Sequence, residues 1–430
     1  MNEIRAMPNA KESDIMDLRH KFLYISFFFP PLGGPEPRHN LSIIRRLYYK
    51  GFQPTIVTAP DDYPYSRDDY LAKQIPKGLD IRQVSWPSKR DMYVREARRR
   101  MRFPENPLVF KRYGPLYRVG KRAIEENKLE FLYSVHGIGA AHLAAMMLKR
   151  EFDLPWVAEF RDPWIDNVIA WNYMKDNSWN WWYNRELNRT RRLMSEILVK
   201  ADLIVVDTAM HRDYLIDGFH VDSDKIEPLG MGYEEEYFNV IKDVPIEFSR
   251  KPVIGFVGSV YYGYDYTVDI LVKSLKILEE NGFDFALISL GDSSGLFSRC
   301  AERQNLKNFL PISRVNYSTA LGLMRLLDFG IILGPKSYKL ILNSKIWEYL
   351  KFNLSVLGIV PEDSMAARVI KEGNCGYILP YEQEAMYQEL KRALIDYSNG
   401  AVKKANSDFI KSFSSEIMVE KLAKRIEELL

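Results

Sequence analysis

Residues 22–59 read FLYISFFFPPLGGPEPRHNLSIIRRLYYKGFQPTIVTA, and this stretch decides the expected fold. The apolar run at 22–29 predicts a buried strand, and the Pro- and Gly-rich segment after it ends that strand. HNLSIIRRLYYKGF then shows apolar residues at helical spacing up to Gly51, and PTIVTA (54–59) predicts a second strand. A strand–loop–helix–strand unit of this kind implies a parallel sheet with helices on its faces.

The same alternation of strands and helices continues along the chain in two series. Each series predicts one doubly wound α/β domain. A segment that is first acidic and then polar, residues 233–250, separates the two and is the expected linker. Further strands are expected at 79–86, 129–136, 155–160, 201–208 and 225–230 in the first series, and at 252–260, 329–335 and 354–361 in the second.

The length of 430 residues is too great for one ordinary core and fits two domains. We expect a polar tail at 1–20, an N-terminal domain at 21–245 and a C-terminal domain at 246–406. The last segment, 407–430, has a helical pattern, and we expect it to pack back on the first domain.

The composition is that of a globular protein, with 47% hydrophobic residues, 27% charged residues and a net charge of +3. Cys300 and Cys375 form no close pair, and the six histidines lack metal-binding spacing, so we expect neither disulfides nor a metal site. The first twenty residues lack the pattern of a secretory signal, and the longest apolar runs fall short of the ~20 residues that span a bilayer. We therefore expect a cytoplasmic protein, and peripheral contact with the inner face of the cell membrane stays open.

Polar residues and glycines follow the predicted strands of the first series. Gly33 and Gly34 suit close approach of an anion to the backbone, or they serve a tight turn that merely needs glycine. His136 ends a strand, where its imidazole is placed either to bond a sugar hydroxyl or to cap a neighbouring backbone group. Arg161 and Asp162 also end a strand, and they are either site residues or a surface ion pair.

The second series has candidates at equivalent places. Gly258 and Ser259 follow one strand and Gly291 follows another, in positions that suit a nucleotide or are ordinary turns. Lys345 and Glu348 share a helix face, where a lysine suits a diphosphate and a carboxylate suits ribose hydroxyls. The alternative for this pair is a solvated i,i+3 salt bridge.

A basic and aromatic stretch covers residues 89–122 and contains few acidic residues. It suits an anionic membrane surface, an anionic glycan or a nucleic acid, or it is a solvated helix with aromatic residues in the core. No readout motif accompanies the charge, so we expect no nucleic-acid partner. A tryptophan-rich segment near residues 171–183 is an interfacial anchor, an acceptor platform or a packed core. The basic residues are Lys89, Arg90, Arg95, Arg98, Arg99, Arg100, Arg102, Lys111, Arg112, Arg118, Lys121 and Arg122.

The ordered set of these segments resembles the family-four glycosyltransferases, such as those of bacterial cell-surface polysaccharide synthesis. FFFPPLGGPEPRHNLSIIRRLYYKGFQPTIVT resembles the opening of that family, and VHGIGAAHLAAMMLKREFDLPWVAEFRDPW resembles its mid-domain segment. KPVIGFVGSV, ISLGD, LLDFGIILGPKS and SKIWEYLKFNLSVLGIVP are similar to its second domain, and the resemblance covers about residues 22–380. It implies a GT-B fold, in which two Rossmann-like domains with parallel sheets face each other across a cleft.

The resemblance also implies roles for individual residues. Gly34 is expected near the donor phosphates and His136 near the transferred sugar. The first domain is expected on the acceptor side, and the second is expected to bind the nucleotide-sugar. Apart from the resemblance, the place of Arg161 and Asp162 at a strand end makes them further candidate catalytic residues. Lys345 is expected to pair with the diphosphate. Glu348, which matches the second glutamate of the family's paired-glutamate motif, is expected to hold the ribose.

The chain departs from the family pattern at two positions. Leu340 stands where the first glutamate of the paired motif is usual, and Ser259 stands where an arginine is usual. No general base is evident, which fits a mechanism in which the leaving phosphate helps to deprotonate the acceptor.

The expected function is therefore that of a retaining glycosyltransferase of the hexosyltransferase type. It moves a sugar from a nucleotide-diphosphate sugar to a glycan or lipid-linked acceptor, without a metal or other cofactor. The alternative is a GT-B-like binding or scaffold protein with weak or no transfer activity, which the two departures motivate.

Overall fold

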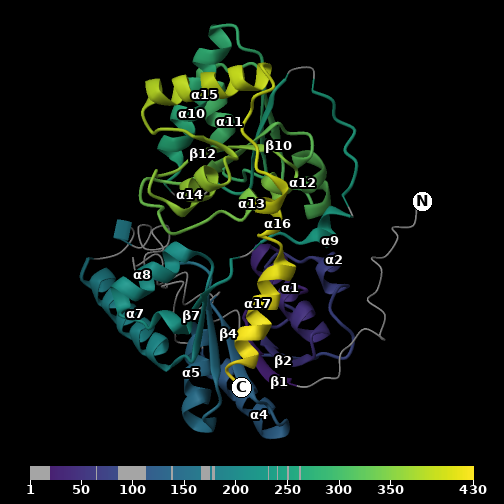
Figure 1. Cartoon of the computed structure of the whole chain (residues 1–430), viewed down its shortest axis with the longest axis vertical. Coiled ribbons are helices and arrows are strands. Elements are labelled where there is room, and N and C mark those ends of the chain that lie inside the picture. Colours follow the sequence, from purple (N-terminus) through teal and green to yellow (C-terminus); the bar gives the residue numbers. More distant parts are fainter. Residues whose placement is uncertain are drawn as a thin grey trace. The chain divides into compact units, whose positions relative to one another are not determined.

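The computed structural model describes residues 20–63, 65–85, 113–136, 139–165, 175–176, 180–230, 232–239, 241–248, 251–260 and 263–430. Most of the basic stretch, and with it Trp171 and Trp179, lies outside these residues. The chain divides into two compact units (Figure 1). Unit 1 comprises Met1–Met231 and Ser415–Leu430, and unit 2 comprises Gly232–Ser414.

Unit 1 is built on a seven-stranded sheet with the order β3-β2-β1-β4-β5-β6-β7, and every pair of neighbours is parallel. Its strands are β1 (His20–Ile25), β2 (Phe52–Thr58), β3 (Asp80–Gln83), β4 (Phe131–Val135), β5 (Trp156–Phe160), β6 (Leu203–Val206) and β7 (Ile226–Pro228). Its helices include α1 (Pro35–Tyr49), α2 (Asp69–Ala72), α4 (Tyr113–Glu126), α5 (Ala140–Phe152), α7 (Asn180–Lys200), α8 (Ala209–Phe219) and α17 (Ser415–Glu427).

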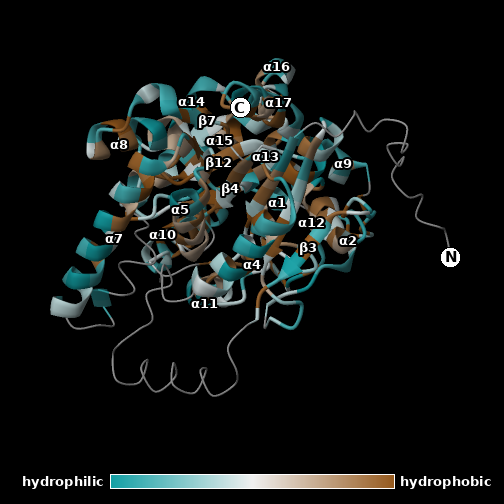
Figure 2. Ribbon diagram, turned by 90° about the horizontal axis from the view of Figure 1, so that it is seen from below, coloured by the Kyte–Doolittle hydropathy of each residue, from teal (hydrophilic) through white to brown (hydrophobic). Residues whose placement is uncertain are grey.

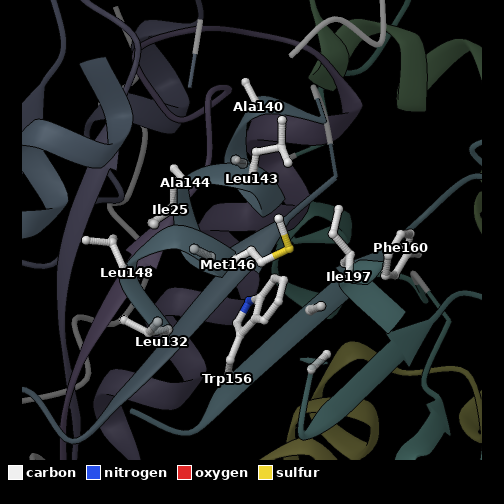
Figure 3. Packing of buried hydrophobic residues seen from close by; sticks show 14 of the residues in the cluster. Ile25, Leu132, Ala140, Leu143, Ala144, Met146, Leu148, Trp156, Phe160 and Ile197 are labelled. Carbon is white, nitrogen blue, oxygen red and sulfur yellow. The ribbon is translucent and has the colours of Figure 1, made fainter. Parts of the chain in front are cut away.

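The main core of unit 1 lies between the sheet and helices α4, α5 and α7. β4 and β5 are buried along their whole length, as continuous apolar strands of a covered parallel sheet should be. Figure 3 shows part of this core, with Trp156 of β5 among side chains of α5 and α7. This cluster lies on the face of the sheet opposite α1, and Leu41 and Ile44 of α1 are buried outside it.

The first strand is shorter than the apolar pattern predicts. β1 ends at Ile25, and Phe27 leaves the sheet to pack with Leu32 and Ala59 in a small separate cluster. A single serine, Ser26, interrupts the run FLYISFFF, but the three phenylalanines after it continue the apolar pattern, so this pattern does not show where sheet pairing stops. The consequence is a loop from residue 26 to residue 34 in which Ser26 is followed by aromatic side chains.

The last helix, α17, belongs to unit 1 although it follows the whole of unit 2 in the chain. It packs on α1. Val419, Leu422 and Ile426 of α17 are almost completely buried. Under it lies a cavity with about 330 Å³ of empty space, part of it open to solvent, which Glu159, Tyr133 and His39 also line.

Unit 2 is built on a six-stranded parallel sheet with the order β10-β9-β8-β11-β12-β13. The strands are β8 (Val253–Val257), β9 (Ala286–Leu290), β10 (Phe309–Ile312), β11 (Phe329–Leu333), β12 (Ser355–Ile359) and β13 (Gly376–Ile378). The helices are α9 (Glu235–Phe238), α10 (Asp265–Glu280), α11 (Leu296–Gln304), α12 (Tyr317–Met324), α13 (Lys345–Lys351), α14 (Met365–Glu372), α15 (Gln383–Ser398) and α16 (Ser407–Lys411). The prediction of two doubly wound domains with parallel sheets is thus confirmed.

Helices of both units are amphipathic, and Figure 2 shows hydrophilic residues on α7 and α4 beside hydrophobic residues of the strands. On α7, Met194 and Ile197 are buried, whereas Arg185 and Arg192 are exposed. Across the part of the chain that the structure describes, no helix is long and apolar enough to cross a membrane.

Candidate functional site

In each unit the strand order reverses between two neighbouring strands. In unit 1 the reversal lies between β1 and β4, and in unit 2 it lies between β8 and β11. At such a switch point the loops after the two strands diverge, and ligands of open α/β sheets bind there. Gly33, Gly34 and His136 follow the switch-point strands of unit 1, and Gly258 and Ser259 follow β8 of unit 2.

The two glycines after β1 have different reasons to be glycine. A Cβ on Gly33 would lie 3.2 Å from atoms of Arg67 and Asp68, and the Gly33 N–H donates to the Ser66 carbonyl at 2.6 Å. Gly34 is the N-cap of α1 and has φ +114, which strains other residues. Packing therefore accounts for glycine at position 33, and the positive φ accounts for glycine at position 34.

Arg161 lies in a buried polar network rather than alone at the strand end. Its guanidinium donates to Glu159 Oε1 at 3.0 Å, to the Glu36 carbonyl at 3.3 Å and to Asn40 Oδ1. Glu159 also bonds His39 Nε2 at 3.0 Å and Tyr133 OH at 2.7 Å. The network ties β4 and β5 to α1 and so fixes the loop that carries Gly34.

The charges of this network balance one another. Burial alone raises the pKa of Glu159, but the Arg161 guanidinium and the hydrogen bond from His39 outweigh burial and hold that pKa well below its usual range. Glu36 has no such hydrogen bond, because its Oε1 atom is buried without a partner among the described residues. Burial raises the pKa of Glu36 to about 8, against the opposing effect of Arg161. Glu36 is thus a mostly protonated carboxyl near neutral pH, beside the glycine loop.

His136 is 7% exposed, and neither ring nitrogen has a hydrogen-bond partner among the described residues. Its ring centroid lies 4.9 Å from that of Trp164 and 5.8 Å from that of His142. Burial lowers the pKa of His136 to about 3, and the charge of His211 acts in the same direction. A neutral imidazole with two unused nitrogens is able to accept one hydrogen bond and donate another.

Asp162 reaches solvent at the end of β5. Burial of the carboxyl among protein atoms nevertheless raises its pKa to about 6, and the carboxylate of Asp207 adds to the effect. Asp207 follows β6, and its Oδ1 lies 3.0 Å from Nδ1 of the fully buried His211. His211 Nε2 has no partner in the described ranges.

The Asp207–His211 pair was missed by the sequence analysis, although its signal is present. Asp207 comes directly after an apolar strand, and His211 follows four residues later, one turn into a helix. Thr208 caps that helix by accepting from the His211 N–H at 3.0 Å. The strand ends of β4, β5 and β6 therefore bring both His136 and Asp162 into electrostatic range of His211, and Asp162 into range of Asp207.

In unit 2, Gly258 and Gly291 end neighbouring strands and lie against each other. Gly258 has φ +139 and Gly291 has φ +84, and a Cβ on Gly291 would lie 3.6 Å from the Gly258 carbonyl oxygen. A Cβ on Gly258 would meet nothing within 4 Å, so open space adjoins this backbone. Ser259 is exposed in the same loop.

Glu348 of α13 has two carboxylate oxygens in different situations. Oε1 accepts from Tyr317 OH at 2.9 Å and from Lys345 Nζ at 3.3 Å. Oε2 is buried and has no partner among the described residues, and Glu348 as a whole is 7% exposed. Leaving such a charged oxygen unpaired costs free energy, so the site is prepared for a hydrogen-bond donor.

Tyr317 was also missed by the sequence analysis. It begins α12, and its ring lies 5.8 Å from Lys345 Nζ. The backbone N–H of Lys345 donates to Asn343 Oδ1 at 3.0 Å. The structure thus brings Lys345, Glu348 and Tyr317 together near the end of β11, the second switch-point strand of unit 2.

No group of three or more His, Cys, Asp or Glu side chains suitable for a metal ion occurs within the described ranges. The candidate residues therefore form two sets. In unit 1 they are Gly34, His136, Arg161 and Asp162, with Glu36, Asp207 and His211 added by the structure. In unit 2 they are Gly258, Ser259, Gly291, Lys345 and Glu348, with Tyr317 added.

No protein-family model matches the sequence, and no curated protein matches it. Among solved structures, the chain is similar to sucrose-phosphate synthase from Thermosynechococcus elongatus, with a TM-score of 0.65 and 12% identity over 96% of this chain and 99% of that one. It is similar to HepE from Anabaena in complex with UDP, with a TM-score of 0.62 and 13% identity over 95% and 100% of the two chains. UDP-GlcNAc 2-epimerase from Neisseria meningitidis bound to UDP-GlcNAc has a TM-score of 0.57 and 11% identity over 95% and 100%. With its two Rossmann-like units of parallel strands, the chain has the GT-B fold.

Proposed function

We propose that this protein is a glycosyltransferase that moves a sugar from a nucleoside-diphosphate sugar to a hydroxyl of a glycan or lipid-linked acceptor. We further propose that transfer retains the anomeric configuration and serves the assembly of a cell-surface polysaccharide. The fold accommodates this chemistry, and it also accommodates UDP-GlcNAc epimerases, so the site residues carry the argument.

The observation that carries the proposal is the buried Oε2 of Glu348 beside Lys345, which has no hydrogen-bond partner among the residues that the structure describes. A carboxylate oxygen with free lone pairs accepts hydrogen bonds from vicinal ribose hydroxyls. An ammonium group one turn away matches a diphosphate. The open backbone at Gly258, which follows β8 and lies against Gly291 after β9, leaves space for the phosphates. In support, the similar HepE structure holds UDP and the similar epimerase structure holds UDP-GlcNAc.

In the proposed reaction the bond between the anomeric carbon and the diphosphate breaks, and a new bond forms from that carbon to the acceptor oxygen. Lys345 stabilises the negative charge of the departing diphosphate, and it exchanges its contact with Glu348 for one with phosphate. The acceptor proton moves to the departing phosphate, because a general base is not needed when that oxygen lies on the same face of the sugar. The proposal requires no metal ion.

Unit 1 is proposed to hold the acceptor and to orient the transferred sugar. His136 is neutral across the physiological pH range, and its two unused nitrogens match sugar hydroxyls as donor and acceptor. Asp162 lies at the neighbouring strand end and is proposed to bind a further hydroxyl. Arg161 acts through Glu159 and Asn40 to position the Gly34 loop.

A thermal-shift panel of nucleoside diphosphates and their sugars tests the donor site. We expect one nucleotide series to stabilise the protein, by about 2.7 kcal/mol at a hundred times its dissociation constant. Lys345→Ala and Glu348→Gln should lose that shift, and EDTA should leave it unchanged. Absence of any shift at millimolar nucleotide contradicts the proposal.

Helix α10 of unit 2 offers a matched control for the Lys345–Glu348 pair. Lys276 and Glu279 form a second i,i+3 pair at 2.9 Å, with side chains 16% and 12% exposed, against 17% and 9% for Lys345 and Glu348. Lys276→Ala should retain the nucleotide shift. If both lysine variants lose the shift equally, the loss reflects general destabilisation and not a donor site.

Product analysis separates the proposed reaction from its competitors. Incubation with the stabilising nucleotide-sugar and an acceptor should release the nucleoside diphosphate and yield a glycoside whose anomeric proton coupling matches that of the donor. An epimerised nucleotide-sugar would assign the chain to the other activity seen on this fold. Binding without any conversion would support the scaffold alternative, for which Leu340 and Ser259 argue.

A further inference from the structure

The loops after β1 and β2 are joined into one platform at the switch point of unit 1. Leu32 and Arg67 form an antiparallel bridge, and the Asp68 N–H donates to the Pro31 carbonyl at 2.9 Å. The Gly33 N–H donates to the Ser66 carbonyl. These backbone bonds hold residues 65–68 against the glycine loop, so side chains in this region have defined positions without any ligand.

Aromatic side chains cover this platform. Phe27 is buried at its base, whereas Phe28 and Tyr63 are half-buried and Tyr65 is 45% exposed. The ring of Tyr63 stands edge-on to that of Phe27, with centroids 5.0 Å apart. The Tyr65 ring lies 5.1 Å from the Phe28 ring and 6.5 Å from the Tyr63 ring, to which it is tilted by 25°. Packing below thus fixes a ring whose outer part faces solvent.

Tyr65 lies directly beside the glycine that opens the switch point. Its hydroxyl would be 3.7 Å from a Cβ on Gly34, so the absence of a side chain there leaves the Tyr65 edge uncovered. The exposed ring therefore adjoins the place where the fold binds ligands, and not an arbitrary part of the surface.

The chemistry around Tyr65 indicates which ligand fits. The exposed large side chains in this segment are tyrosines, Tyr65 and Tyr70, and the exposed aliphatic ones lie elsewhere in the described chain. Arg67 and Asp61 are exposed beside them, with Arg67 Nη1 donating to the Asp61 carbonyl at 2.6 Å. An exposed tyrosine ring in a segment that also carries exposed charged side chains matches a pyranose, which has a C–H face and a rim of hydroxyls. A lipid or protein partner needs a continuous apolar surface instead.

We propose that Tyr65, supported by Tyr63 and Phe28, is a stacking subsite for a sugar ring of the acceptor glycan. This subsite rests on the proposed function for its role in the reaction, but binding of a sugar there does not require transfer. Arg67 and Asp61 would contact the hydroxyls at the rim of the ring.

The test measures glycan binding without nucleotide, so that it does not depend on the donor site. Chitotriose, cellotriose and mannotriose at millimolar concentration serve as probes, with saturation-transfer difference NMR as the readout. At least one should bind the whole chain. Tyr65→Ala should weaken that binding about tenfold, and Tyr65→Phe, which keeps the ring, should bind within about threefold of the unsubstituted protein.

Two control variants make the test specific. Tyr266→Ala removes another exposed tyrosine, 58% exposed and in unit 2, and Trp181→Ala removes a 57% exposed tryptophan on α7. Neither should change glycan binding. Absence of binding by all three probes overturns the proposal, as does equal loss in Tyr65→Ala and a control.

The same variants distinguish failure of this proposal from failure of the proposed function. Tyr65→Ala should retain the nucleotide shift of unit 2, which also shows that it is folded. Loss of glycan binding with an intact nucleotide shift supports both proposals. Glycan binding through Tyr65 in a protein that no nucleotide stabilises supports the subsite and contradicts the transferase.

Discussion

The hydroxyl of Tyr317 donates to Oε1 of Glu348 at 2.9 Å, and this contact leaves the other carboxylate oxygen as the one available to a ligand. Tyr317 is 31 residues from Glu348 in sequence and reaches it from the start of a different helix. The tyrosine therefore orients the carboxylate that we propose to bind the donor ribose.

Tyr317→Phe tests this orientation. Removing the hydroxyl deletes a hydrogen bond to a charged group, and such bonds are worth about 1.5–3 kcal/mol. We expect nucleotide affinity to fall about 3- to 10-fold, because the carboxylate is less firmly held. Isothermal titration with the nucleotide found in the thermal-shift panel measures the change. Unaltered affinity in Tyr317→Phe, with affinity lost in Glu348→Gln, would show that Lys345 alone holds the carboxylate.

Glu159→Gln tests the buried ionic network of unit 1. The substitution leaves Arg161 without its partner charge, and breaking a buried pair in this way costs about 3–5 kcal/mol. Glu130, which contacts His20 at 2.8 Å on the surface, supplies the control, since an exposed pair contributes about 0–1 kcal/mol. Urea titrations of Glu159→Gln and Glu130→Gln compare the free energies of unfolding. Equal losses in the two variants would show that the network does not stabilise unit 1.

The raised pKa of Glu36 predicts a pH dependence with a definite sign. The folded-state pKa is about 8 against an ordinary value of 4.5, so the folded protein binds an extra proton between these two pH values. This contribution to stability is fully present below pH 4.5 and is lost as pH rises through 8, at up to about 1.4 kcal/mol per pH unit. Glu36→Gln mimics the protonated form and should lose the dependence.

Melting temperatures at pH 5 and pH 8.5 check the prediction for Glu36. Between pH 5 and pH 8.5, the melting temperature of the unsubstituted protein should fall by more than that of Glu36→Gln. Glu125→Gln, which alters a carboxylate on the surface of α4 that is 50% exposed, should behave as the unsubstituted protein. Parallel curves for all three proteins would place the Glu36 pKa near its ordinary value.

Asp207→Asn should lower the pKa of Asp162. Burial is the main cause of the value of about 6, but the negative charge of Asp207 adds to it. Removing that charge makes ionisation of Asp162 easier, so its pKa should move below 6. Carbon-13 NMR titration of the aspartate carboxyls measures the pKa of Asp162 directly. Asp213→Asn, on the exposed side of α8, is the control that should leave the titration of Asp162 unchanged.

The alternation of strands and helices was sufficient to predict the fold, because continuous apolar strands between amphipathic helices have few other solutions. It was also sufficient to place His136, Gly258 and Lys345 at strand ends or helix starts. This alternation did not predict the partners of these residues. Glu159 meets His39 across 120 residues of sequence, and only the order of strands in the sheet brings them together.

Residues with short-range signals were also missed, for a different reason. His211 follows Asp207 by four residues, but an i,i+4 pair of this kind is common on solvated helices, and its burial is not visible in the sequence. Tyr65 and Tyr63 resemble ordinary loop residues, since their common platform depends on the bridge between Leu32 and Arg67. The end of β1 was misplaced because three phenylalanines after Ser26 continue the apolar pattern beyond Ile25.

The place of α17 in unit 1 has a consequence for how the protein is made. A ribosome releases α1 early and α17 after the whole of unit 2, yet the two helices pack on each other. The apolar surface of unit 1 against which Val419, Leu422 and Ile426 pack therefore stays exposed while unit 2 is being synthesised. Nascent unit 1 should be a client for chaperones during that interval, and a chain that stops before Ser415 should remain one.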